Sequence, residues 1–140
     1  MNASGNQFSQ TPAMWAVVNG HLNVLHYLLE QGVYLHQTDS YGYNFLHHAI
    51  QNNRTIIAHY LLEKGMQIDT RDNEGHTALM WAAYCNFEES VRYLISQGAD
   101  IQQKDNTGMT SLHWASVKGH KKCMFTLVQN STFMNFFLYY

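Results

Sequence analysis

Apolar side chains recur along the chain in short helical stretches that are separated by polar turns. Apolar doublets mark the buried edge of one set of stretches, and they are Leu28-Leu29, Leu61-Leu62, Leu94-Ile95 and Leu127-Val128. A stretch with a small alanine at its centre precedes each doublet. The pattern predicts first helices over 12–19, 45–52, 78–85 and 111–118, and second helices over 22–30, 55–63, 88–96 and 121–129.

The same residue types return every 33 residues, which indicates an internal repeat. Glycine recurs as Gly32, Gly65 and Gly98, aspartate as Asp39, Asp72 and Asp105, and alanine as Ala16, Ala49, Ala82 and Ala115. Four units of 33 account for 132 of the 140 residues without an insertion or a deletion. Because several residue classes agree on one period, coincidence is excluded as the explanation.

Local signals predict the same shape for each unit. Thr11-Pro12 is typical of an N-cap followed by proline at the first helical position. Gly32 and its counterparts stand where a helix ends in a left-handed residue, and Asp-x-x-Gly then predicts a hairpin turn. Neither helix of a unit can bury its apolar face alone, so the units must stack. We therefore predict an all-α solenoid of four 33-residue helix-turn-helix units joined by β-hairpin turns.

Composition and charge narrow the class of protein. Eight Lys and Arg stand against ten Asp and Glu, and this net charge of −2 argues against a nucleic-acid partner. The longest apolar run, Ala78 to Cys85, is far shorter than the roughly 18 residues of a membrane span. Met1 to Gln10 has no signal-peptide pattern, and the two cysteines have no Cys-x-x-Cys spacing. We expect a soluble, cytoplasmic protein without a membrane span.

The segment GADIQQKDNTGMTSLHWASVKGH, from Gly98 to His120, closely resembles the ankyrin repeat consensus. The resemblance covers about residues 8–131 and implies an ankyrin-repeat solenoid. It divides the chain into an N-terminal extension at 1–10, repeats at 11–43, 44–76 and 77–109, a partial repeat at 110–131 and an aromatic tail at 132–140. Only the first copy keeps the proline of the family's Thr-Pro-Leu-His signature, so the other first helices are expected to be less pre-organised.

The two ends of the array lack the polar face that usually caps such a stack. After Gln129 the pattern stops, because Ser131 replaces the glycine and no aspartate follows. Phe133, Phe136, Phe137 and Tyr140 fall at helical spacing, so the tail could cover the fourth unit as a makeshift cap. The alternatives are that Tyr140 is not the natural end of the array, or that the chain is a fragment that associates end to end.

The sequence predicts no catalytic site. His-Glu-x-x-His, Cys-x-x-Cys, Gly-x-Ser-x-Gly and glycine-rich phosphate loops are absent, so we expect no enzyme activity, no cofactor and no metal. The resemblance implies a structural role for His47 and His113, which would bond local backbone and tie neighbouring hairpins together. Cys123 lies near two lysines that would lower its pKa slightly, but an ordinary thiol is the simpler interpretation.

A ladder of large side chains is the strongest binding signal. The residue after the histidine position is Trp15, His48, Trp81 and Trp114, again at the 33-residue step. In ankyrin geometry this position faces the concave groove, with lateral packing against the next unit as the alternative. Asn19 and Asn52 are expected beside the aromatic residue of the following unit, and Tyr41 and Tyr43 at a hairpin tip. The polar tip residues are expected to be solvated turns, and they are Asn73, Glu74, His76, Asn106 and Thr107.

These features predict a non-catalytic, monomeric adaptor or scaffold that binds a protein partner in the groove. A narrower resemblance implies an alternative function: TALMWAAY (77–84) and SLHWASVKGH (111–120) are similar to the ankyrin repeats of Asp-His-His-Cys palmitoyltransferases. The chain would then be the substrate-recruiting portion of a membrane protein S-palmitoyltransferase, at the cytoplasmic face of the membrane. It contains no Asp-His-His-Cys segment, so in either case it cannot itself transfer an acyl group.

Overall fold

The molecule is described by a computed structural model that covers the backbone of residues 10–139 and the side chains of residues 10–131. This part of the chain forms eight helices and no strand. The helices are α1 (Pro12–Val18), α2 (Leu22–Glu30), α3 (Phe45–Gln51), α4 (Thr55–Glu63), α5 (Ala78–Tyr84), α6 (Glu88–Ser96), α7 (Ser111–Lys118) and α8 (Lys121–Tyr139).

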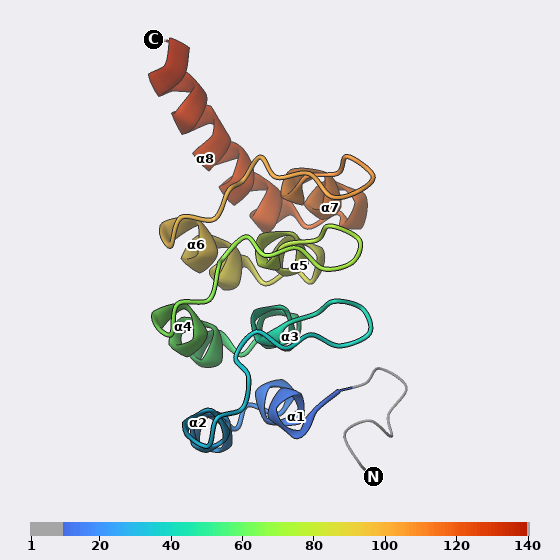
Figure 1. Cartoon of the computed structure of the whole chain (residues 1–140). Helices are drawn as coiled ribbons and strands as arrows, with labels where there is room; N and C mark the ends of the chain where they lie inside the picture. Colours follow the sequence, from blue (N-terminus) through green and yellow to red (C-terminus); the bar gives the residue numbers. More distant parts are fainter. Residues whose placement is uncertain (1–9, 140) are drawn as a thin grey trace.

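The helices stack as consecutive antiparallel pairs, with α1 and α8 at opposite ends of the stack (Figure 1). The first helices α1, α3, α5 and α7 form one layer in which each contacts the next, and α2, α4 and α6 form a second layer beside it. The loops that lead into α3, α5 and α7 project from the stack on the side of the first helices. The predicted all-helical solenoid is therefore confirmed.

Seven helices begin and end within one residue of their predicted limits, but the predicted end of the last helix at 129 is wrong. α8 continues to Tyr139 and extends beyond the stack in Figure 1. In the other units a glycine at φ +95° ends the second helix, as Gly32, Gly65 and Gly98 show. Ser131 stands at that position in the last unit, so the helix has no left-handed residue that would stop it. The side chains of the predicted aromatic cap lie outside the described residues.

The first helices all begin with a side-chain cap. Thr11, Thr77 and Thr110 each accept a hydrogen bond from the backbone N–H three residues later. Asn44 does the same in the second unit, where threonine is missing. The N-cap therefore persists in every unit although only α1 retains proline at its first position, because Asn and Thr satisfy the same free N–H group.

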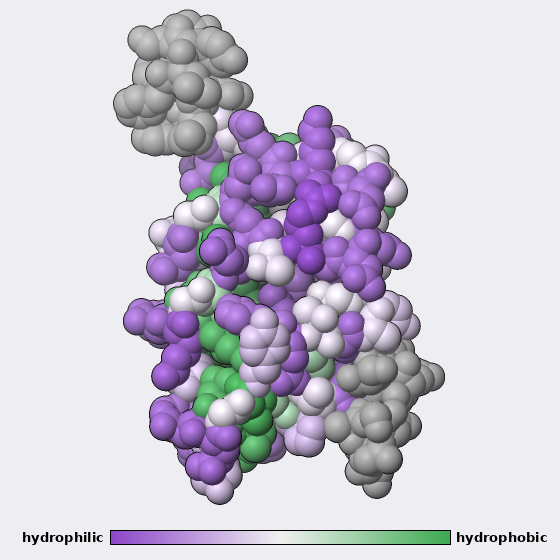
Figure 2. Space-filling model, viewed as in Figure 1, coloured by the Kyte–Doolittle hydropathy of each residue, from purple (hydrophilic) through white to green (hydrophobic). Residues whose placement is uncertain are grey.

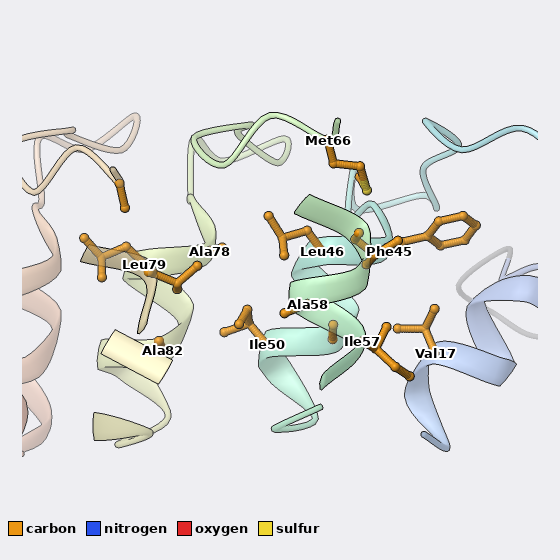
Figure 3. Close-up of a cluster of buried hydrophobic side chains, with 14 of the residues drawn as sticks. Val17, Phe45, Leu46, Ile50, Ile57, Ala58, Met66, Ala78, Leu79 and Ala82 are labelled. Atoms are coloured by element: carbon orange, nitrogen blue, oxygen red, sulfur yellow. The ribbon is translucent and has the colours of Figure 1, made fainter. Parts of the chain in front are cut away.

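The hydrophobic core lies between successive pairs, where first and second helices of neighbouring units meet (Figure 3). Phe45 is directed toward the first pair, whereas Leu46 and Ile50 are directed toward the third. The repeated alanines Ala49, Ala82 and Ala115 are fully buried, which is what a close approach between first helices requires. Burial of this kind stabilises a helix pair only when its neighbour is present, as expected for a solenoid.

The projecting loops are hairpin turns that bind one another rather than strands of a sheet. The backbone N–H of Asn73 donates to the carbonyl of Tyr41, and its side-chain amide donates to the carbonyl of Ser40. Asn106 repeats this pattern one unit later, on the carbonyls of Glu74 and Asn73. Asn73 and Asn106 are exposed turn residues, as predicted, and in addition their amides join successive hairpins.

Gly75→Ala is expected to destabilise the fold more than Gly65→Ala. Both glycines have positive φ, +84° and +95°, so alanine costs about 1–2 kcal/mol at either position. A Cβ at Gly65 would meet open space, whereas at Gly75 it would lie 2.9 Å from the backbone nitrogen of Asn106. This clash adds about 1–3 kcal/mol, because the stacked hairpins must separate. Urea unfolding of the two variants measures the difference, and equal losses would contradict the hairpin packing.

Candidate functional site: an aromatic groove

The ladder residues of three units are anchored on aspartates of the hairpins. The Nε1–H of Trp81 donates to Asp72 Oδ2 at 3.1 Å, and the Nε1–H of Trp114 donates to Asp105 Oδ2 at 2.9 Å. In the second unit His48 Nε2 lies 2.9 Å from Asp39 Oδ2 in the same relation. The indole N–H groups are thus used within the chain, and the rings of Trp81 and Trp114 are partly exposed and line a cavity.

The same aspartates hold the hairpin turns. Oδ1 of Asp72 accepts the backbone N–H groups of Glu74 and His76 at 3.0 and 2.9 Å. Asp105 makes the equivalent contacts. Burial alone would raise the pKa of Asp105, but hydrogen bonds from the Thr107 side chain, the Met109 backbone and the Trp114 indole lower it to about 2. Each carboxylate therefore couples a turn to a ladder side chain.

Trp15 and His48 differ from the other two ladder positions. The indole nitrogen of Trp15 is buried and has no hydrogen-bond partner in the described part of the chain. The residue that corresponds to Asp39 in the first unit is Asn6, which lies outside the described residues. His48 is only 2 % exposed, so its imidazole supports Asp39 from inside the fold. All three tryptophans are partly exposed, but only Trp81 and Trp114 combine an anchored indole N–H with a shared cavity.

The two asparagines of the predicted groove bind their own helices. The side-chain amide of Asn19 donates to the carbonyl of Trp15, and that of Asn52 donates to the carbonyl of His48, both at 2.8 Å. Each amide therefore satisfies a carbonyl at the end of a first helix. Asn52 lies in a hollow of about 230 Å³ that Tyr41, Tyr43 and His48 also line, so the structure brings these four predicted residues together. Asn19 does not line it.

Tyr43 connects this hollow to the next unit. Its ring stacks on Tyr41 at a centroid distance of 5.3 Å and stands edge-to-face to both His48 and Trp81, at 5.7 and 5.5 Å. Burial, and then the charges of Asp72 and Asp39, raise the pKa of Tyr43 to about 12, so its hydroxyl stays protonated. Successive ring contacts therefore connect Tyr41 through Tyr43 to Trp81.

A second cavity, of about 150 Å³, lies between the third and fourth units. Four rings surround it, and we call them the aromatic box: His76, Trp81, Tyr84 and Trp114. Met80 completes the lining. Each ring stands nearly perpendicular to its two neighbours, with interplanar angles of 78° to 83° and centroid distances of 5.5 to 5.7 Å. The four contacts close into a circuit.

Two members of the aromatic box were missed by the sequence argument. His76 was predicted to be a solvated turn residue, which is wrong, because its ring nitrogens lie 3.4 Å from Asp72 and 3.2 Å from Asp105. The signal was available: His76 is 33 residues after Tyr43, and both bridge successive ladder residues. Tyr84 occupies a position that is Val18, Gln51 or Val117 in the other units, so the repeat gave no reason to single it out.

The rest of the described chain offers little reactive chemistry. No group of three or more potential metal ligands is present among the residues searched. Burial, and then the charge of Glu88, raise the pKa of the Cys123 thiol. The neighbouring lysines therefore do not lower this pKa, the alternative that the sequence analysis had set beside an ordinary thiol. The face seen in Figure 2 is mostly hydrophilic, with its hydrophobic areas gathered mainly over the α2 and α4 side.

Stability is expected to fall as the pH drops below 6.5, because two buried histidines must stay neutral. Burial lowers the pKa of both His47 and His48 from 6.5. The neutral imidazoles therefore favour folding above pH 6.5, and this contribution is lost as the pH falls toward their folded pKa values. Asp105 adds a second loss as the pH falls from its ordinary pKa of 3.8 to about 2.

Urea unfolding at stepwise pH, followed by circular dichroism, measures this dependence. His48→Gln keeps an N–H donor for Asp39 but cannot be protonated, so it is expected to flatten the step below pH 6.5. An unfolding midpoint that stays constant through this range would contradict the expectation.

Comparison with known proteins identifies one family. The family model described as ankyrin repeats (3 copies) matches residues 1–72 and 67–136. No curated protein matches the chain. In the described residues, no helix is both long and apolar enough to cross a membrane.

Proposed function

Because the chain belongs to the ankyrin repeat family, whose repeats generally mediate protein–protein interaction, we propose that it is a non-catalytic adaptor that binds an extended segment of a partner protein. The proposed binding surface is the groove between the first helices and the hairpins. Its proposed residues are Trp15, Asn19, Tyr41, Tyr43, His48, Asn52, Trp81 and Trp114. We further propose a monomeric, cytoplasmic protein whose repeats have the boundaries expected from the sequence.

The observation that carries this proposal is the anchoring of Trp81 and Trp114. Each indole N–H is bonded to a buried carboxylate, so the ring is held in one orientation before a partner arrives. Both tryptophans remain partly exposed and line a cavity. A large side chain that is already ordered loses little conformational entropy on binding, which is why such residues act as hot spots.

The fold itself supplies a matched test. The second unit has His48 at the ladder position, bonded to its aspartate. Trp81→His together with Trp114→His therefore preserves a donor for each carboxylate while it removes most of the apolar surface. Against a peptide selected on the wild-type chain from a random library, this double variant is expected to lose about 10- to 100-fold in affinity.

A variant on the opposite layer serves as the control. Ile56 on α4 is 74 % exposed, and Ile56→Ser is expected to leave peptide affinity unchanged. Circular dichroism and urea unfolding establish that both variants remain folded. Affinity that survives the double substitution but is lost in Ile56→Ser would place binding on the second helices and overturn the groove.

The palmitoyltransferase alternative keeps the same groove but makes it the substrate-recruiting portion of a larger membrane enzyme. Its support is the placement of Trp81 and Trp114 on successive first helices, the feature on which the narrower resemblance rests. An antibody raised against the array distinguishes the two hypotheses. A soluble endogenous protein near 16.2 kDa would favour the free adaptor, whereas a much larger protein in the membrane fraction would favour the recruiting portion of an acyltransferase.

A further inference from the structure

Resting on the proposed function, we infer that the aromatic box binds the trimethylated ammonium of a methylated lysine in the partner's segment. The box is a closed circuit of four rings around a cavity of about 150 Å³. Aromatic rings attract cations through the negative potential of their faces, and quaternary ammonium groups are bound in this way by cages of several rings.

The dimensions of the box suit a cation at its centre. Its four sides, measured between ring centroids, are 5.5 to 5.7 Å. In a circuit with nearly equal sides, the midpoint lies closer to every corner than one side length. A cation at the midpoint is thus within about 6 Å of all four centroids, the range in which a ring and a cation attract each other.

Charge behind the rings favours the same occupant. The side chains of Asp72 and Asp105 are 2 % and 1 % exposed, and they accept the N–H groups of the two indoles. His76 lies between these two carboxylates. The box therefore has two carboxylates directly behind its walls, and a bound cation is attracted by both.

The lining selects the methylated form of lysine. It consists of the four rings and Met80, and no carboxylate lines the cavity. An unmodified ammonium would leave its N–H groups without a charged acceptor there, which is costly. A trimethylammonium group has no N–H, carries its charge within a shell of methyl groups, and needs only ring faces around it.

One ring of the box already carries a positive charge on it. The Nζ of Lys118 lies 5.1 Å from the centroid of Tyr84, which shows that this ring accepts an ammonium on one face. The charge of Lys118 also repels a second cation that approaches the box. A lysine ammonium is compact and strongly hydrated, so an incoming trimethylammonium competes well with it, because it loses less hydration on entering an apolar cavity.

A peptide can contact more of this aromatic surface than a free quaternary ammonium can. Tyr43 contacts Trp81, so the aromatic surface extends from the box toward the preceding unit. Residues that flank a methylated lysine can lie along this extension, whereas a molecule such as choline would leave it empty. The repeat also restricts the box to one place in the described stack, because Gln51 replaces Tyr84 in the second unit and Val18 and Val117 replace it in the first and fourth.

The test uses the whole chain and its three tryptophan indole N–H signals in nuclear magnetic resonance spectra. The probes are a short Gly-rich peptide with one trimethyl-lysine, the same peptide with unmodified lysine, the same peptide with the uncharged tert-butyl analogue of trimethyl-lysine, and choline. The trimethyl-lysine peptide is expected to shift the signals of Trp81 and Trp114 but not that of Trp15, and to bind about tenfold more tightly than the other three probes.

Two substitutions at the exposed residue Tyr84 distinguish a loss of binding at the box from a loss of folding. Tyr84→Phe keeps the ring and is expected to keep binding, whereas Tyr84→Gln reproduces the second unit and is expected to weaken it about tenfold. Equal binding of the tert-butyl analogue or of choline, or no shift of the two indole signals, would overturn the inference. A selected unmethylated peptide that still requires Trp81 and Trp114 would leave the proposed function standing while the methyl-lysine inference fails.

Discussion

Replacing Asp72 by alanine is expected to lower the free energy of unfolding by about 3–5 kcal/mol, a loss that few single substitutions produce. The side chain accepts three hydrogen bonds, from the backbone of Glu74 and His76 and from the indole of Trp81. Alanine leaves all three donors without this acceptor inside the hairpin, and each buried, unsatisfied donor costs about 1–3 kcal/mol, although such costs are not additive.

Urea unfolding followed by circular dichroism measures this loss. Asp72→Asn is expected to fall between wild type and alanine, because its carbonyl oxygen can still accept the two turn N–H groups. Asp100 provides a matched control: its side chain also accepts a backbone N–H, from Gln102, but the residue is exposed. Asp100→Ala is expected to cost less than about 1 kcal/mol. A similar loss for the two alanine variants would contradict the coupling of turn and ladder.

His47→Ala is expected to cost about 3 kcal/mol, whereas His113→Ala, at the same position of the repeat, is expected to cost less than about 1 kcal/mol. His47 is buried. Its Nδ1 accepts the backbone N–H of Asn44, and its Nε2 lies 3.0 Å from the carbonyl of Thr70 and 3.1 Å from that of His76. One imidazole thus joins the cap of α3 to the following hairpin.

His113 makes only the local half of these contacts. Its Nδ1 accepts the backbone N–H of Thr110, but α8 follows instead of another hairpin, and the side chain is exposed. The two substitutions therefore remove the same chemical group with and without its contact to the next unit. Denaturation of both variants under one condition gives the comparison. Equal losses would mean that His47 acts through its helix cap alone.

The family assignment itself could be made from sequence because the signals are local and repeated. An N-cap, a left-handed glycine and an apolar stretch each act over a few residues, and four copies let a weak signal be recognised. The same reasoning failed at the last helix, where the stop signal at Ser131 is missing and α8 continues to Tyr139. Asn44, which stands where the other units have threonine, caps its helix by the same local interaction.

The groove could be predicted only in outline. The ladder positions follow from the repeat, but the prediction had all four side chains along the groove, whereas His48 is buried on Asp39. The asparagine amides bind carbonyls of their own helices, a partner that the spacing argument did not anticipate. In each case a polar group has a partner within the protein. For the buried His48 the reason is that an unsatisfied buried group is more costly than a lost contact with solvent.

The sequence by itself determined the 33-residue period, the limits of seven helices and the positions at which large side chains recur. Only the tertiary structure decided that His76 and Tyr84, on a hairpin and at a helix end, close a box around Trp81 and Trp114. The physical reason is the range of the forces involved. Caps, turns and helical periodicity depend on neighbours in the chain, whereas contacts between units depend on how each pair stacks on the next, which no single repeat encodes.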